Sequence, residues 1–213
     1  MDILLVGGAG VGKDTVGDIL KRHGYISIAI ADILKTMVYR VWSANDAEAK
    51  ITAIYCGVLG CSPGEDYPRL KRIAQGIKGV DAFEKTQIRP YLQELGDIFR
   101  NKEPDVFSRI LLEKVEEVRG MEKTPPVVIT DGRLEREVNY FKERGFFTVK
   151  IVCDYDLRVE RLIKRDGSFD TAVLLHITEK DIEGINCDHI LANNGTIADL
   201  EKEIASWQLP VLS

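Results

Sequence analysis

A glycine-rich segment near the start of the sequence constrains the fold more than any other feature. The apolar run 2–6 leads directly into Gly7-Gly8-Ala9-Gly10-Val11-Gly12-Lys13, and residues 14–22 have the spacing of an amphipathic helix. A strand, a glycine-rich loop and a helix in this order are typical of a phosphate-binding loop, or P-loop. Glycines let backbone N–H groups curl around an anion, and the helix N-terminus adds its positive dipole end. The segment therefore predicts a site for a nucleoside triphosphate.

Individual residues of this loop have predicted roles. Lys13 is expected in a solvated loop, from which its charge reaches the outer phosphates. Asp14 occupies the position that usually holds a magnesium-binding Ser or Thr, and Thr15 follows it. An ordinary helix N-cap is the alternative role for Asp14. The predicted triphosphate-binding residues of the loop are Gly8, Ala9, Gly10, Val11, Gly12, Lys13, Asp14 and Thr15, of which Asp14 and Thr15 are also magnesium candidates.

The rest of the chain alternates between β-rich runs and amphipathic helical segments. Such alternation predicts an α/β fold, in which a parallel sheet carries helices on both faces. After the first strand, further strands are predicted at 25–30, 127–130, 146–152 and 188–191, and helices are predicted to start near 31, 86, 106, 134, 155 and 196. Segment 45–80 is predicted to be a partly helical insertion outside the sheet, and 166–184 a lid.

Composition narrows the class of protein. The 213 residues suit one domain, and the net charge of −5 argues against a general nucleic-acid-binding surface. No apolar run is long enough for a membrane span, and no signal peptide is evident, so a cytoplasmic protein is expected. The four scattered cysteines predict free thiols, without zinc-site spacing.

Asp131 is the candidate carboxylate that would bind magnesium together with the glycine-rich loop. It follows the continuous apolar run 127–130, which is typical of a strand buried on both faces. In open α/β sheets, ligands bind at the carboxyl ends of such strands. A carboxylate there is suited to magnesium, whereas capping of the next helix is the alternative role.

Arginines favour a transferase over a plain hydrolase. Arg89 and Arg100 share a predicted helix with Gln93, whereas Arg133 follows Asp131. These separate elements could converge on one side of the loop. Two or three guanidinium forks would define a monophosphate site. Arg158, Arg161 and Arg165 share one face of another helix, before the predicted lid. Solvated surface charge is the alternative for each arginine alone.

In these features the sequence resembles the phage-type deoxynucleoside monophosphate kinases, a branch of the P-loop nucleoside and nucleotide kinases. The similar segments are Gly7–Thr15, with its Gly-Lys-Asp-Thr, then 28–35, 89–100, Thr130-Asp131-Gly132-Arg133 with Glu137, and Asp188-His189-Ile190 with Asn194-Gly195. The resemblance implies a three-layer P-loop kinase fold with five parallel strands in the order 2-3-1-4-5, forming a single domain over 1–213.

The resemblance also implies roles for particular residues. Asp32, Lys35, Arg89, Gln93, Arg100, Arg133 and Glu137 would bind the acceptor, while Arg158, Asn194 and Gly195 would join the loop in binding ATP. Lys13, Arg133, Arg161 and Arg165 would be catalytic, and Asp14, Thr15 and Asp131 would hold magnesium. The insertion 45–80 and the lid have no counterpart in the resemblance, so we expect the base of the acceptor to be chosen there and near Tyr39, Trp42 and Phe99.

These inferences predict an enzyme that transfers the γ-phosphoryl group of ATP, with Mg²⁺, onto a (deoxy)nucleoside 5′-monophosphate. Its expected partner is that small substrate, with neither nucleic acid nor membrane, and a homodimer is left open. One rival is a kinase for another phosphorylated small molecule, of the phosphomevalonate or dephospho-coenzyme A type. The other rival is a regulatory nucleotide-binding ATPase, for which the arginine set has no evident use.

Overall fold

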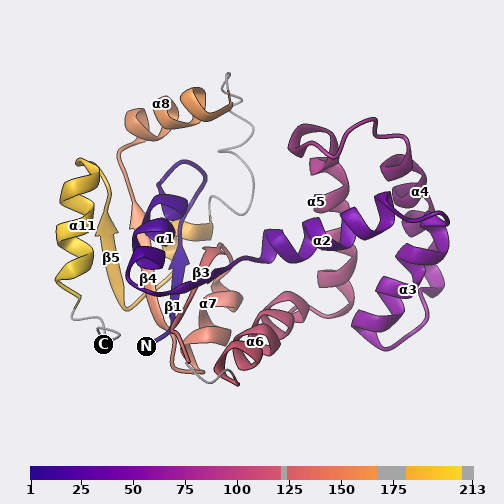
Figure 1. Cartoon of the computed structure of the whole chain (residues 1–213), viewed down its shortest axis with the longest axis horizontal. Helices are drawn as coiled ribbons and strands as arrows, with labels where there is room; N and C mark the ends of the chain where they lie inside the picture. The colour runs from indigo at the N-terminus through magenta and orange to yellow at the C-terminus, as the bar shows by residue number, and fades with distance from the viewer. Residues whose placement is uncertain (121–123, 167–180, 208–213) are drawn as a thin grey trace. The chain divides into compact units, whose positions relative to one another are not determined.

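The computed structural model describes residues 1–120, 124–166, 181–207 of the chain. These residues divide into two compact units, which are described separately (Figure 1). The first unit comprises Met1–Ala29 and Leu112–Ser213 and contains the whole sheet; the second is Ile30–Leu111 and is helical. The central fourteen residues of the predicted lid, 167–180, lie outside the described part.

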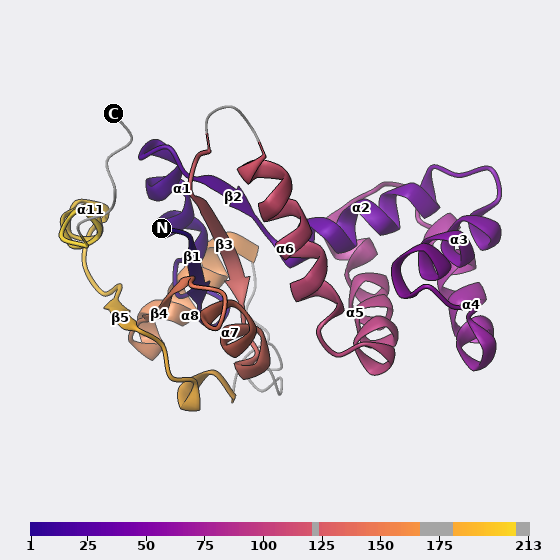
Figure 2. The same cartoon turned by 90° about the horizontal axis from the view of Figure 1, so that it is seen from below.

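The sheet of the first unit has five parallel strands in the order β2-β3-β1-β4-β5, as the resemblance implied (Figure 2). Because parallel neighbours need crossover connections, helices separate the strands in sequence. β1 occupies the centre and pairs with both β3 and β4. The strands are β1 (Ile3–Val6), β2 (Ile26–Ile28), β3 (Val127–Gly132), β4 (Phe147–Val152) and β5 (His189–Ala192).

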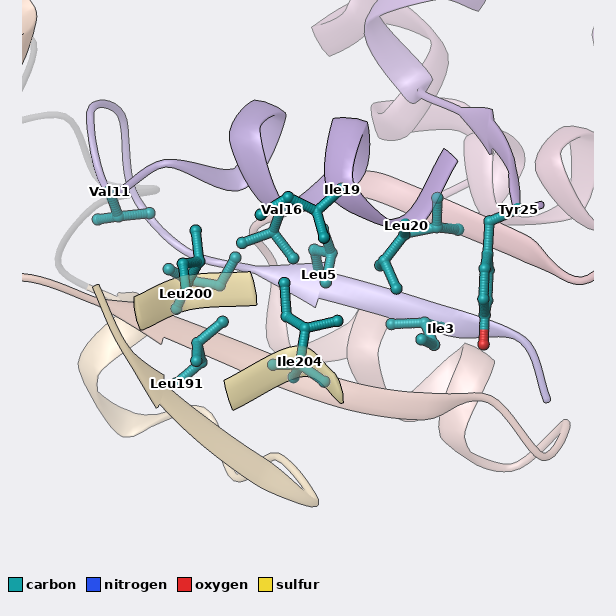
Figure 3. Close-up of a cluster of buried hydrophobic side chains, with 13 residues drawn as sticks. Ile3, Leu5, Val11, Val16, Ile19, Leu20, Tyr25, Leu191, Leu200 and Ile204 are labelled. Carbon is teal, nitrogen blue, oxygen red and sulfur yellow. The ribbon is translucent and has the colours of Figure 1, made fainter. Parts of the chain in front are cut away.

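One face of the sheet is covered by α1 (Lys13–Arg22) and α11 (Ile197–Ala205). Ile3 and Leu5 of β1 point toward this face and pack in a buried cluster with residues such as Ile19 of α1 and Ile204 of α11 (Figure 3). Side chains of a strand alternate between faces, so Leu4 and Val6 point the other way. Both are fully buried, which shows that the opposite face is covered too.

Helix α7 (Glu135–Lys142) covers that opposite face, where it packs against β1 and β4 (Figure 2). Its buried side chains are Glu137, Val138 and Phe141. Helix α8 (Tyr155–Asp166) follows β4, and the short η2 (Asp181–Gly184) precedes β5. With a helical layer on each side of the sheet, the three-layer α/β prediction is confirmed.

The second unit packs its helices around aromatic and aliphatic side chains. Tyr55 and Phe99 are fully buried, with ring centroids 5.7 Å apart. Segment 45–80, predicted to be partly helical, contains α3, η1 and α4. The helices are α2 (Ile30–Trp42), α3 (Ala47–Leu59), η1 (Gly64–Asp66), α4 (Tyr67–Lys78), α5 (Lys85–Lys102) and the start of α6 (Val106–Arg119), which continues into the first unit.

The second and third strands differ from the sequence prediction in their length. The second strand is three residues long rather than the predicted 25–30, because α2 already begins at Ile30, whose side chain is buried as a helical residue. The third strand continues through Asp131 to Gly132. Cys56, Cys61, Cys153 and Cys187 are free, as predicted. Within the described ranges, every helix is too short or too polar to cross a membrane.

Candidate phosphate-binding site

The glycine-rich loop leaves the sheet at its centre. Val6, the last residue of β1, is in register with Gly132 of β3 on one side and with Lys150 of β4 on the other. The Gly7 N–H continues the pairing by donating to the Gly132 carbonyl oxygen at 3.3 Å. The loop therefore starts at the carboxyl edge of the sheet, where ligands bind in this architecture.

Two glycines give the loop its shape. Gly10 and Gly12 have φ values of 82° and 97°, in the left-handed region that side chains other than glycine rarely adopt. A Cβ atom at Gly10 would come within 2.9 Å of Cγ of Leu162, so a side chain there would also lack space. Gly12 is the N-cap of α1. The loop thus turns tightly into the helix N-terminus, which favours an anion.

Lys13 is not in a solvated loop, and this expectation was wrong. It is the first residue of α1 and only 8% exposed. Its Nζ atom donates to the carbonyl oxygens of Gly7 at 2.5 Å and of Gly8 at 2.8 Å. The ammonium group is therefore held inside the curl of the loop, because its long side chain folds back over the glycines. A cation enclosed by a glycine-rich curl fits a phosphate group.

Neither aspartate acts as the helix cap that was its alternative role. Gly12, rather than Asp14, is the N-cap of α1, and Asp14 lies exposed in the first turn. Asp131 lies within β3, two residues before Arg133. The N-cap of α7 is Leu134. Asp131 is half-buried at the sheet edge from which the loop departs, since its neighbour Gly132 pairs with Val6.

Two arginines of α8 lie against the loop region, as the sequence suggested for this helix. The Arg158 Nε atom donates to the carbonyl oxygen of Ala9 at 2.6 Å. The Arg161 Nη1 atom donates to the carbonyl oxygen of Asn193 at 3.0 Å. Both side chains are half-buried, whereas Arg165, one turn further along, is exposed. The structure thus places positive charge of α8 beside the loop through Arg158 and Arg161.

The turn after β5 contributes a residue that the sequence analysis missed. Asn193 is 6% exposed, and its Nδ2 atom donates to the carbonyl oxygen of Val11 at 2.9 Å. Asn194, which was predicted to bind ATP, is exposed and exchanges hydrogen bonds with Asp154, and its contact with ATP stays a prediction. Two adjacent asparagines differ by only one position in the sequence, so spacing alone gave no signal to choose between them.

Cys153 lies beside these arginines, in an environment that disfavours its thiolate form. Burial raises the pKa of its thiol above the usual value, while the positive charges of Arg161 and Arg158 act in the opposite direction with less effect. Since the thiolate is the reactive form, this cysteine is a poor nucleophile at neutral pH.

Glu137 organises the segment that carries Arg133. Its side chain is 5% exposed, and Oε2 accepts from the backbone N–H groups of Arg133 at 3.1 Å and Leu134 at 3.2 Å. These bonds satisfy N–H groups at the start of α7, which is a capping interaction. In the described chain Glu137 therefore fixes the backbone at Arg133, and its predicted contact with a substrate stays a prediction.

The remaining acceptor candidates belong to the second unit. Arg89, Gln93 and Arg100 lie on one side of α5 at helical spacing, with Arg89 and Gln93 exposed. The Arg100 guanidinium lies over the ring of Phe107, 4.8 Å from its centroid. On α2, Asp32 and Lys35 are exposed and pair with each other at 2.9 Å. That pair is a solvated ion pair one turn apart, so a contact with substrate stays a prediction for both.

The aromatic residues expected near the acceptor base have different environments. Phe99 is fully buried between Tyr55 and Phe107, so it belongs to the core. Tyr39 is 49% exposed, and its ring lies edge-on to Phe83 with centroids 5.2 Å apart. Trp42 completes this cluster, 5.6 Å from Phe83. Phe83 is the member that the sequence analysis did not single out.

Comparison with solved structures identifies the fold. The chain is similar to the Thermus thermophilus protein TT1252, with a TM-score of 0.52 and 20% identity over 97% of this chain and 95% of that one. It is also similar to a dephospho-CoA kinase from Campylobacter jejuni, with a TM-score of 0.53 and 15% identity over 96% and 94% of the two chains. A Janibacter sugar kinase matches with a TM-score of 0.50 and 14% identity over 99% and 95%.

These likenesses agree with the strand order, and the chain has the α/β fold of P-loop kinases. No protein-family model matches the sequence, and no curated protein does either.

Proposed function

We propose that this protein is a kinase that transfers the γ-phosphoryl group of ATP to a (deoxy)nucleoside 5′-monophosphate. The observation that carries the proposal is the enclosed ammonium of Lys13, 2.5 and 2.8 Å from two carbonyl oxygens of the glycine-rich loop. Arg158, bonded to the same loop, adds a second cation from another element. Fixed positive charge at one end of a parallel sheet suits a triphosphate.

The reaction needs charge and position more than it needs a base. An acceptor phosphate oxygen is already anionic, so no strong proton acceptor has to activate it. The residues of this chain would instead hold the donor phosphates against Lys13 and stabilise charge that develops on the transferred group through Arg161. Arg89, Arg100 and Arg133 are the proposed grip on the acceptor phosphate, and Arg165 is a further candidate for the transferring group.

The donor set fits magnesium held mainly by phosphates and water. Asp14, Thr15 and Asp131 are the residues that would hold the ion, directly or through water. In the described part of the chain no three His, Cys, Asp or Glu side chains form a cluster able to hold a metal alone. Magnesium in phosphotransferases takes one or two protein ligands and completes its shell with substrate and water. When bound, it would neutralise charge on the phosphates.

A second candidate acceptor is a different phosphorylated small molecule, favoured by the likeness to a protein named as a dephospho-CoA kinase. Such an enzyme would share the donor-side residues and differ in the acceptor pocket. A regulatory ATPase is the third candidate and would release ADP with no acceptor at all.

A coupled ADP-release assay separates the three candidates. The acceptors are the four deoxynucleoside monophosphates, the four ribonucleoside monophosphates, dephospho-coenzyme A, phosphomevalonate and water alone. We expect ADP release that requires a nucleoside monophosphate, with formation of the matching diphosphate confirmed by anion-exchange chromatography. Release that requires only dephospho-coenzyme A or phosphomevalonate would select the second candidate, and release independent of any acceptor would select the third.

A further inference from the structure

Asn193 connects three parts of the first unit in one buried position. It follows β5, and its backbone N–H donates to the carbonyl oxygen of Val152, at the end of β4, at 2.8 Å. Its side-chain Nδ2 donates to the carbonyl oxygen of Val11 in the glycine-rich loop at 2.9 Å. Its own carbonyl oxygen accepts from Nη1 of Arg161 at 3.0 Å. The end of β4, the glycine-rich loop and α8 therefore all form hydrogen bonds with this residue.

The bond to Val11 determines the direction of the next peptide N–H. A peptide unit is planar and trans, so its C=O and its N–H point in opposite directions. Because Asn193 holds the Val11 carbonyl oxygen, the Gly12 N–H points away from Asn193. A Cβ atom at Gly12 would overlap the Nδ2 atom of Asn193, so the glycine and the amide are fitted to each other.

We propose that Asn193 is a positioning residue for phosphoryl transfer: its amide fixes the Val11–Gly12 peptide of the phosphate loop, and its carbonyl orients the Arg161 guanidinium. This inference rests on the proposed function. It assigns a role to the β5–α11 turn through Asn193, which touches no reacting atom and acts through the loop and the arginine.

The chemistry explains why an amide suits this position. Asn supplies an N–H donor to a carbonyl oxygen, whereas an Asp of the same size supplies only acceptors when ionised. A carboxylate would leave the Val11 oxygen without its donor and would bring negative charge next to a site for phosphates. Asn193→Asp therefore removes the hydrogen bond while it keeps the volume of the side chain.

The test uses the full chain with Asn193→Ala and Asn193→Asp. The matched control is Thr148→Val, which removes other side-chain hydrogen bonds in the same unit. The Thr148 hydroxyl donates to Asp188 Oδ2 at 2.7 Å and accepts from the Asp188 backbone N–H at 2.9 Å. Two quantities are measured at a temperature well below every melting transition. They are the Kd of Mg²⁺–ATPγS by calorimetry and amide hydrogen exchange in the segment 8–13 compared with β3.

We expect Asn193→Ala to raise the Kd about tenfold, as for one lost hydrogen bond, and Asn193→Asp to raise it at least as much. Exchange should become faster in 8–13 but not in β3. Thr148→Val should leave both quantities within twofold of the wild-type values. If the alanine variant does not fold, the isosteric aspartate variant decides the same comparison.

Wild-type Kd and wild-type exchange in the Asn193 variants would overturn the proposal, as would an equal rise of the Kd in Thr148→Val, which would indicate general destabilisation. Failure of the wild-type chain to bind Mg²⁺–ATPγS is a different result, because it counts against the proposed function. In that event, faster exchange confined to 8–13 supports the positioning of the loop by Asn193, and unchanged exchange refutes it.

Discussion

The Nε atom of Arg158 donates to the carbonyl oxygen of Ala9 at 2.6 Å, although the two residues are 149 positions apart in the chain. The bond attaches α8 to the glycine-rich loop and places a guanidinium group against the loop. Arg158 therefore differs from an ordinary solvated arginine, which was the alternative for each arginine of this helix.

Arg158→Lys should weaken the binding of ATP more than the binding of the acceptor. Lysine keeps the charge but cannot reproduce the Nε donor of a planar guanidinium. We expect the KM for ATP to rise several-fold and the acceptor KM to change by less than twofold, in steady-state assays with each substrate varied. The control is Arg22→Lys, on the same unit, where the arginine pairs with Glu201 on the surface at 2.7 Å. An acceptor KM that rises as much as the ATP KM would contradict the donor-side assignment.

Lys13→Met should abolish transfer while the chain stays folded. Methionine keeps most of the apolar stem of this buried side chain and removes the ammonium group, which removes the hydrogen bonds to the carbonyls of Gly7 and Gly8. Loss of a preorganised charge at the transferring group should lower kcat/KM on the order of 10²–10³-fold.

Circular dichroism and a thermal melt would show whether Lys13→Met remains folded. Lys13→Ala should melt at a lower temperature than Lys13→Met, because it also removes the buried stem. Turnover at the wild-type rate in Lys13→Met would refute the donor site.

Asp131→Asn should lower kcat and shift the magnesium dependence to higher concentration. The change keeps the size of the side chain at the end of β3 and removes its charge. Since Glu137 accepts from the N–H groups at the start of α7, the helix cap stays intact and stability should change little. A drop of about 10- to 100-fold in activity is expected for a group that supports a metal. Unaltered kcat with an unaltered magnesium midpoint would exclude the metal role.

Arg89→Lys should affect the acceptor specifically. Arg89 is exposed on α5 and would lose the bidentate fork of its guanidinium. One lost charge-assisted hydrogen bond corresponds to roughly 1.5–3 kcal/mol, or about one to two orders of magnitude in kcat/KM for the acceptor. Arg40→Lys, an exposed arginine of α2, is the control. Normal acceptor kinetics would return Arg89 to the solvated surface, and an equal rise in the ATP KM would move it to the donor side.

Asp188 should make stability depend on acid pH. Burial by itself would raise the pKa of its carboxyl group, but hydrogen bonds from Lys142 and Thr148 lower it below the usual value. Lys142 pairs with it at 2.7 Å. A carboxyl group whose pKa is lowered by folding contributes stability above its unfolded pKa, about 4, and this contribution is lost as pH falls through the native pKa.

Denaturant unfolding between pH 3 and 7 would measure that contribution. The free energy of unfolding should fall more steeply below pH 4 in the wild-type chain than in Asp188→Asn, and the variant should be less stable at pH 7. If the free energy of unfolding depends on pH in the same way for the two proteins, Asp188 does not contribute to the loss of stability at acid pH.

Local sequence determined the elements whose signals are contained within a few residues. The apolar run before Gly7 and the helical spacing after Lys13 were enough to predict strand, loop and helix. The continuous apolar run before Asp131 predicted a buried strand. The strand order came from the resemblance, and the structure confirms it.

Contacts between distant residues were decided only by the tertiary structure. Spacing within α8 predicted that Arg158 and Arg161 share a face. The residues that this face contacts depend on the pairing of β4 with β1 and of β5 with β4. The hydrogen bond from Asn193 to Val11 is of the same kind, since it joins residues 182 positions apart in the chain. The burial of Lys13 also depends on the folded curl of the loop.

The physical reason is that local patterns report backbone propensity and the periodicity of burial, which depend on near neighbours. A hydrogen bond between residues far apart in the chain depends on the register and order of strands, which are selected by the packing of the whole core. The sequence by itself therefore determined that a phosphate-binding loop opens a parallel α/β fold. The tertiary structure decided which side chains, Lys13, Arg158, Arg161 and Asn193, hold that loop in its shape.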